Sequence, residues 1–322
     1  MGTQTRTWYW EKLGNIFEPS CHRAWAGTHA QVPTVLVLDD RLRVYYADRD
    51  ASGRSFPTFF DVCLDDPTRV IYFHKTSVLV GGAPGTFDDE GLMPAWVHRR
   101  HGRVWMYYSG WNRRVSVPYH NSTGLCVSDD NGFSFQRVYE GPIMDRTPDE
   151  PYLAVTPWVM CNEQGEDTVW QCWYISGLRW DMVDGKFEPV YVIKCATSRD
   201  GHHWVRPNIQ CVEQGYPQEA FSHPTVLLRN GLYHMWYCYR DSVDYRNGSG
   251  SYRIGYATSD NGENFRRFDA ASGLQISAAG WDSKMMCYPY VIEVGGLTYM
   301  FYNGNGFGRS GIGVAILRGE LT

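Results

Sequence analysis

The sequence lacks the features of several large classes of protein. It has no run of 18 apolar residues, which a membrane-spanning helix requires, and its N-terminal segment, 1–17, lacks the apolar stretch of an export signal. It has no cluster of Lys and Arg suited to a phosphate backbone, and its net charge is -5. We therefore expect a soluble, cytoplasmic protein that binds neither a membrane nor nucleic acid.

The cysteines do not form a metal or disulfide pattern. There are nine of them, an odd number, scattered singly, with no CxxC pair and no Cys/His group at zinc spacing. Several lie within apolar segments, which favours small buried hydrophobic residues in a reducing compartment. We expect no bound metal and no cofactor.

Helical periodicity is also missing over any long segment. The chain contains 33 Gly and 16 Pro, which interrupt helices and mark turns between strands, and 15% of its residues are aromatic. This composition predicts an all-β protein with at most short helical turns.

An internal repeat indicates which all-β architecture to expect. Five segments begin near a proline, run as an apolar strand to a turn and return as a Tyr-rich strand: 32–50, 93–112, 156–177, 223–241 and 288–306. Their prolines recur at nearly equal intervals along the chain, at Pro33, Pro94, Pro157, Pro224 and Pro289. Such repeats predict a five-bladed β-propeller, with one repeat in each blade.

The rest of each repeat supplies two further predicted strands. A third strand ends, in three repeats, in a similar polar turn with Ser, Asp or Asn, and Gly, at 128–135, 198–204 and 259–265. These turns are interpreted as structural, because Asp or Asn bonds the turn backbone and Gly accepts positive φ. A fourth strand is expected after each turn, at 136–144, 205–212 and 266–276.

The last repeat has no fourth strand of its own before the sequence stops at Thr322, whereas residues 8–17 resemble one. We expect this N-terminal strand to complete the last blade and close the ring, leaving no long unpaired edge. Residues 1–322 would then be a single domain.

The first strand of each blade lines the central channel of a propeller, so the residues just before the repeat prolines should converge there. Four of these five segments contain carboxylates, and the candidate catalytic residues are Asp89, Glu150, Glu219 and Asp282, together with His29 of the first repeat. Burial and mutual repulsion can separate the pKa values of such carboxylates, so that an acid and a base coexist near neutral pH.

The same segments, and the loops after the second strands, offer candidate substrate-binding side chains. These are Gln31, Arg49, Asp50, Asp88, Glu90, Trp111, Asn112, Trp180, His223, Arg240, Asp241, Lys284, Tyr288, Asn303 and Asn305. Arg and Asn beside carboxylates can bond hydroxyl groups, and aromatic rings can cover sugar faces. The expected ligand is a carbohydrate or another small polyhydroxylated molecule.

Two other interpretations of these polar residues stay open. They could satisfy one another structurally at the bases of the blades. Alternatively, His29, His223 and carboxylates could hold a central metal ion or water, although their spacing matches no established ligand motif.

The pattern resembles the five-bladed propeller glycoside hydrolases: family 43, the invertase-like enzymes and the mannoside phosphorylases. This resemblance implies a carbohydrate-active enzyme in which an Asp of the first blade, an Asp of the second and a later Glu act together. Asp89 and Glu219 are the counterparts of the later two, with Glu150 as the competing acid. The first repeat differs, since His29, Ala30 and Gln31 stand where the Asp is expected, and no invertase-like Asn-Asp-Pro-Asn or Glu-Cys motif occurs.

Three functional hypotheses follow. The leading one is action on a glycosidic bond, with Glu219 or Glu150 as general acid and Asp89 or Asp282 as base; Asp88, Glu90 and His29 are further candidates for the base. The second is a glycan-binding propeller that has lost catalysis. The third is another reaction on a small metabolite, with His29 or His223 as base. The resemblance also extends to propellers associated with surface-polysaccharide gene clusters, which implies a role in glycan synthesis or tailoring.

Overall fold

The protein is almost entirely built of β-strands. A computed structural model describes residues 8–19, 27–164, 167–246 and 248–321. These residues form 19 strands, and their only helical segments are a 3₁₀ turn at Asp269–Ala271 and the short α1 at Asn305–Gly308. The predicted all-β class is confirmed.

The strands follow the chain as antiparallel meanders. The first contains β2 (Gln31–Val37), β3 (Arg41–Arg49), β4 (Ser55–Cys63) and β5 (Val70–Phe73). The second contains β6 (Gly91–Arg100), β7 (Arg103–Arg113), β8 (Tyr119–Ser128) and β9 (Gln136–Arg137), and the third β10 (Ala154–Gln164), β11 (Asp167–Val183) and β12 (Lys186–Ser198). The fourth contains β13 (Glu219–Arg229), β14 (Leu232–Asp241), β15 (Arg253–Ser259) and β16 (Arg266–Arg267), and the last β17 (Cys287–Val294), β18 (Leu297–Asn303) and β19 (Ile312–Arg318).

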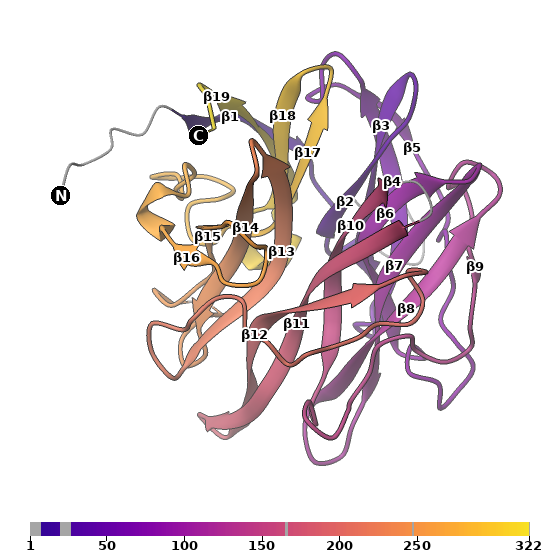
Figure 1. Ribbon diagram of the computed structural model, residues 1–322, viewed down its shortest axis with the longest axis vertical. Helices are drawn as coiled ribbons and strands as arrows, with labels where there is room; N and C mark the ends of the chain where they lie inside the picture. The colour runs from indigo at the N-terminus through magenta and orange to yellow at the C-terminus, as the bar shows by residue number, and fades with distance from the viewer. Residues whose placement is uncertain (1–7, 20–26, 165–166, 247, 322) are drawn as a thin grey trace.

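The first strands of the meanders surround the middle of the molecule, and later strands lie toward the outside (Figure 1). Strand β2 contacts β6, β6 contacts β10, β10 contacts β13, β13 contacts β17, and β17 contacts β2. Single parallel pairings, Ser55 with Gly91 and Ser122 with Ala154, join the first three meanders into one curled sheet. The inner ends of five strands are thereby brought around a common space.

The core lies between neighbouring meanders and is rich in aromatic residues. Trp158 of β10 donates its indole N–H to the Val226 carbonyl of β13 at 2.9 Å. The Trp158 ring also meets the ring of Tyr290 on β17, with centroids 4.9 Å apart. One buried side chain therefore connects three inner strands.

The first strand of the structure, β1 (Tyr9–Phe17), pairs antiparallel with the last strand, β19, from Tyr9 opposite Arg318 to Phe17 opposite Ile312. The Trp10 ring of β1 lies edge-on to Trp236 of the fourth meander, with centroids 5.5 Å apart. The predicted pairing of the N-terminal strand with the last repeat is confirmed.

The predicted fourth strands are shorter than expected. Strands β9 and β16 have two residues each, and the third repeat has only isolated pairings, Thr197 with Val205 and Lys194 with Gln210. The segment between them contains Pro207 and Asn208, which has a φ of 62°, so neither can continue a regular strand.

The three polar turns have the structural role that the sequence predicts. The Ser hydroxyl at each accepts a hydrogen bond from the turn glycine: Gly132 to Ser128, Gly201 to Ser198 and Gly262 to Ser259, at 2.8, 3.0 and 3.0 Å. The glycine carbonyls accept from the preceding meander: Tyr45 to Gly132, Tyr107 to Gly201 and Trp173 to Gly262, at 2.8, 2.6 and 2.7 Å. The turns therefore join neighbouring meanders.

Candidate functional site

A cavity of about 310 Å³ lies where the inner strands meet. Each of the five inner strands contributes to its wall, through Gln31 and Val32, Met93, Val155 and Thr156, Ser222, and Tyr288. The remaining lining residues are His29, Arg49, Trp111, Tyr119, Asn121, Leu153, Ile175, Tyr191, Tyr245, Arg246, Tyr252 and Phe307. This volume is at the lower end of the range for ligand pockets, which suits a small ligand or the end of a longer one.

A repeated β-bulge shapes this wall. In four of the inner strands the residue before the repeat proline has a left-handed φ: Val32 at 59°, Thr156 at 47°, His223 at 50° and Tyr288 at 55°. The strand register shifts at the same places. Such conformations cost about 1–3 kcal/mol each and are found where a strand is bent to redirect a side chain. The repeat prolines therefore mark the bends that face the cavity.

The predicted carboxylates Asp88 and Glu219 are buried in ion pairs. Arg137 of β9 donates from Nε and Nη2 to one oxygen of Asp88, at 2.9 and 2.7 Å. Arg267 of β16 donates to both oxygens of Glu219, at 2.7 and 2.8 Å. In both cases the cation comes from the outermost strand of the same meander.

The other two carboxylates have similar surroundings. Glu150 accepts hydrogen bonds from Tyr174 at 2.9 Å and Ser176 at 2.6 Å, with Arg206 Nε 3.5 Å away. Asp282 accepts from Lys12 Nζ of β1 at 2.6 Å and from Tyr302 at 3.1 Å. All four carboxylates are at most 2% exposed, and none lines the cavity. Asp88, Glu150 and Glu219 pair within their own meanders and Asp282 pairs with β1, so the structure does not bring the four together as one group.

The remaining predicted acidic residues lie in turns or at the rim. One oxygen of Asp89 accepts from the Gly85 amide at 2.7 Å, whereas the other is buried with no hydrogen-bond partner among the described residues. Glu90 pairs with Arg113 at 3.3 Å. Asp50 accepts from Arg54 at 2.9 Å, and Asp241 caps the Val243 amide at 2.7 Å. None of these side chains lines the cavity.

Five of the predicted site residues do line it: His29, Gln31, Arg49, Trp111 and Tyr288. The other predicted binding residues have structural contacts instead. Asn112 bonds the Thr86 carbonyl, Asn303 holds Val32 and Ala30, Asn305 caps the Lys284 amide, Trp180 meets Tyr119 and His223 packs against Tyr288.

His29, Gln31 and Arg49 form a polar group at the first meander. Arg49 Nε donates to Gln31 Oε1 at 2.6 Å, and His29 Nδ1 lies 2.8 Å from the Thr28 hydroxyl. Burial, followed by the charges of Arg49 and Arg309, lowers the pKa of His29 to about 4. His29 is therefore neutral near pH 7.

A second polar group, which was not predicted from the sequence, joins the third and fourth meanders. Tyr245 donates to Glu188 at 2.6 Å, and Arg246 donates to the two oxygens of Glu188 at 3.0 and 2.9 Å. Burial acts to raise the pKa of Glu188, but the hydrogen bonds from Arg246 and Tyr245 outweigh it and the pKa is lowered. The carboxylate is therefore held ionised.

The position of Glu188 depends on a long hairpin. Strands β11 and β12 have 17 and 13 residues, longer than the other pairs, and turn at Asp184 and Gly185. An Asp-Gly pair between alternating apolar residues is typical of a hairpin, so this extension could have been predicted from the sequence. The contact with Tyr245 could not, because Tyr245 belongs to a different meander.

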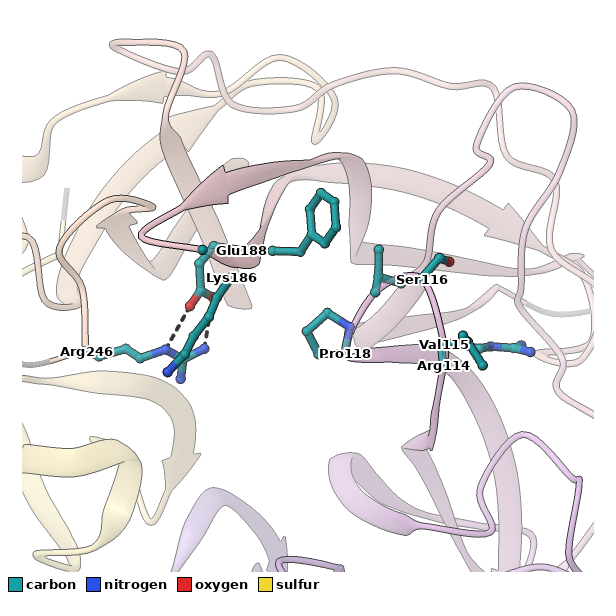
Figure 2. A pocket seen from close by; sticks show the side chains of 10 residues that line it. Arg114, Val115, Ser116, Pro118, Lys186, Glu188 and Arg246 are labelled. Carbon is teal, nitrogen blue, oxygen red and sulfur yellow. Dashed lines mark hydrogen bonds and ion pairs between the residues drawn. The ribbon is translucent and has the colours of Figure 1, made fainter.

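Beside this hairpin is an outer groove of about 580 Å³. Figure 2 shows Glu188, Lys186 and Arg246 on one side of it, and Ser116 and Pro118 of the 114–118 loop on the other. Arg246 lines both the groove and the central cavity. The two hollows therefore adjoin at this residue.

Metal ligands do not gather at the site. Within the part of the chain that the structure describes, no three His, Cys, Asp or Glu side chains are placed to hold a metal ion. Both ring nitrogens of His223 are buried without a hydrogen-bond partner there, and burial lowers the pKa of His223 to about 3.

Among the residues that the structure describes, no helix has the length and apolarity needed to span a bilayer.

Comparison with solved structures shows the fold. The chain superposes on the BT0996 RGII complex with a TM-score of 0.73 and 18% identity, over 98% of this chain and 93% of its counterpart. A thermostable family-43 glycoside hydrolase gives a TM-score of 0.62 and 15% identity, over 94% of this chain and 91% of the hydrolase. The expected resemblance to propeller glycoside hydrolases is confirmed at the level of fold.

No family model matches the sequence. A relative does: "Uncharacterized protein MT1551" of Mycobacterium tuberculosis (strain CDC 1551 / Oshkosh) is 33% identical over 310 residues, which are 96% of this chain and 99% of the relative. The chain belongs to the family of this mycobacterial protein and has the fold of the propeller glycoside hydrolases.

Proposed function

We propose that the protein binds a carbohydrate in its central cavity. The observation that carries the proposal is the lining of this cavity, in which aromatic rings stand beside forked hydrogen-bond donors and acceptors. Trp111 and Tyr288 can cover the apolar faces of a sugar, while Gln31, Arg49 and Asn121 can bond its hydroxyl groups. The fold supports the same ligand class, because the structural neighbours are glycoside hydrolases.

The surroundings of the carboxylates that were assigned from the sequence favour glycan binding over glycan cleavage. Asp88, Glu150, Glu219 and Asp282 each lie within 3.5 Å of a cationic side chain, and no Asp or Glu is among the described residues that line the cavity. Glycosidic hydrolysis normally needs two carboxyl groups on either side of the scissile bond.

A second candidate function, action on a glycosidic bond, is favoured by the contact between Tyr245 and Glu188. A tyrosine beside a carboxylate can serve as the nucleophile in place of the usual carboxylate. The Tyr245 oxygen would bond to the anomeric carbon as the glycosidic bond breaks, its proton would pass to Glu188, and the departing oxygen would take a proton from water. The hydroxide left by that water would then attack the anomeric carbon and release the Tyr245 oxygen, which would recover its proton from Glu188. The assignments of Asp89, Glu150, Glu219, Asp282 and His29 belong to this candidate as alternatives.

We further propose that residues 1–322 are a single five-bladed propeller domain whose last blade is completed by β1. The contacts of β2, β6, β10, β13 and β17 in a closed order and the pairing of β1 with β19 support this proposal.

A glycan array followed by mass spectrometry of the bound glycans tests the two functions together. Binding without a change in glycan mass supports recognition alone. Products that disappear in both Tyr245→Phe and Glu188→Gln, with binding retained, support cleavage by that pair. The absence of binding to every glycan on the array would contradict both.

A further inference from the structure

The charges around the cavity are strongly unequal. Arg49 and Arg246 line it, Arg240 lies behind its tyrosines, and Arg309 is close enough to affect the pKa of His29. Of these four, as far as the described residues show, only Arg246 has a carboxylate partner, Glu188. The chain as a whole has a net charge of -5, so this concentration of guanidinium groups opposes the overall charge.

Arg49 has hydrogen-bond donors that are available to a ligand. Its Nε donates to Gln31, but neither of its terminal amino groups has a partner among the described residues. Burial lowers the pKa of Arg49, and the neighbouring Arg246 and Arg309 act in the same direction. A guanidinium group without a counter-charge in a partly buried wall is poised for a carboxylate or a phosphate-like group, which its planar fork fits well.

Arg240 adds a second positive charge near Glu188, the carboxylate that already pairs with Arg246, so two guanidinium groups share one carboxylate. The Arg240 side chain is 1% exposed and donates to neutral acceptors only: Tyr252, Ser242 and the Pro189 carbonyl, at 3.1, 2.8 and 2.8 Å. Its guanidinium lies 3.8 Å from the centre of the Tyr245 ring, which lines the cavity. A buried cation of this kind raises the electrostatic potential of the space beside it.

We propose that the ligand is an anionic glycan, in which a sugar carrying a carboxylate, sulfate or phosphate group places that group against Arg49. This inference rests on the proposed carbohydrate function and names its substrate class. The outer groove fits the same class, because Lys186 and Arg246 lie on one of its sides next to the cavity (Figure 2). A longer glycan would place its acidic unit in the cavity and its next units in this groove.

Isothermal titration with matched sugars tests the inference. The probes are glucose as the neutral reference, glucuronate, glucose 6-sulfate, glucose 6-phosphate and inorganic phosphate alone. The proteins are the wild type, Arg49→Gln, Arg309→Gln at the exposed rim, and Arg103→Gln as control. Arg103 is exposed and pairs with Asp129, away from the cavity. Thermal unfolding establishes that each variant is folded.

We expect at least one acidic sugar to bind the wild type at least tenfold more tightly than glucose, with affinity that falls as salt is added. Arg49→Gln should remove this preference, Arg309→Gln should reduce it and Arg103→Gln should leave it unchanged. The sugar that binds best identifies the acidic group.

Equal binding of glucose and the acidic sugars to the wild type would overturn the inference and leave the carbohydrate function standing. A preference for acidic sugars that survives in Arg49→Gln would also overturn it. Arg49-dependent binding of inorganic phosphate, with no binding of any sugar, would overturn both proposals. So would the absence of any binding.

Discussion

Arg267 donates two parallel hydrogen bonds to Glu219, with Nη1 and Nη2 at 2.7 and 2.8 Å from the two carboxylate oxygens. Two other meanders place a cation of their last segment on a carboxylate at the inner end, Arg137 on Asp88 and Arg206 beside Glu150. For the last meander, Lys12 of the paired strand β1 contacts Asp282 in the same way. The repetition of this contact indicates that it joins the outer edge to the inner end in four of the five meanders.

Removing one partner of such a pair should lower the stability of the folded protein. Glu219→Gln removes one of the two carboxylates that pair with Arg267, which is 21% exposed and keeps Asp269 as its other partner. We expect a loss of about 1–3 kcal/mol in the free energy of unfolding. Urea titration measures it, with Glu263→Gln in an exposed turn as control. Unchanged stability together with lost turnover would contradict the structural role and favour Glu219 as general acid.

Acid should destabilise the protein through His223. Burial lowers the pKa of His223 to about 3, against 6.5 when the chain is unfolded. Between these values the unfolded state binds the proton and the folded state does not, so stability is present above pH 6.5 and falls with pH below it. The contribution is up to about 1.4 kcal/mol per pH unit.

His223→Asn should flatten this part of the stability curve, since Asn cannot titrate there and accepts the φ of 50°. His101→Asn is the matched control, because His101 has a φ of 47° in an exposed turn. Urea titrations between pH 4 and 7 compare the three proteins. An identical slope in His223→Asn and wild type would show that His223 is not the group responsible.

The proposed closure of the ring rests on the pairing of β1 with β19. Trp10 is 4% exposed and packs against Trp236, whereas the neighbouring Tyr9 on the same strand is 57% exposed. We expect Trp10→Ala to lose about 3–5 kcal/mol in the free energy of unfolding. Tyr9→Ala should change it by less than about 0.5 kcal/mol. Equal effects of the two substitutions on thermal unfolding would be inconsistent with a closing role for this strand.

The fold could be predicted largely from repetition. The regular spacing of Pro33, Pro94, Pro157, Pro224 and Pro289 marks the inner strands, and the polar turns follow from Ser, Asp or Asn, and Gly at fixed offsets. The short fourth strands could not be predicted well, because the composition of segments such as 205–212 resembles that of a strand although Pro207 and the positive φ of Asn208 interrupt it.

The sequence predicted only those residues of the candidate site whose position follows from their place along a strand. Position along the strands places His29, Gln31, Arg49, Trp111 and Tyr288 at the cavity. The side-chain direction of Glu150 or Glu219 depends on a cation far along the chain, Arg206 or Arg267, which the local pattern does not reveal. Glu188 was missed because its partners Tyr245 and Arg246 belong to another meander.

If a carbohydrate binds among the aromatic residues of the cavity, its affinity should depend on Trp111. Trp111 lines the cavity at one end of β7, whereas Trp105, near the other end of the same strand, stacks on Trp170 away from it. We expect Trp111→Ala to lower glycan affinity by tenfold or more, since stacked aromatic contacts contribute about 1–3 kcal/mol. Trp105→Ala should keep the affinity of the wild type. Glycan binding that is undiminished in folded Trp111→Ala would contradict binding in this cavity.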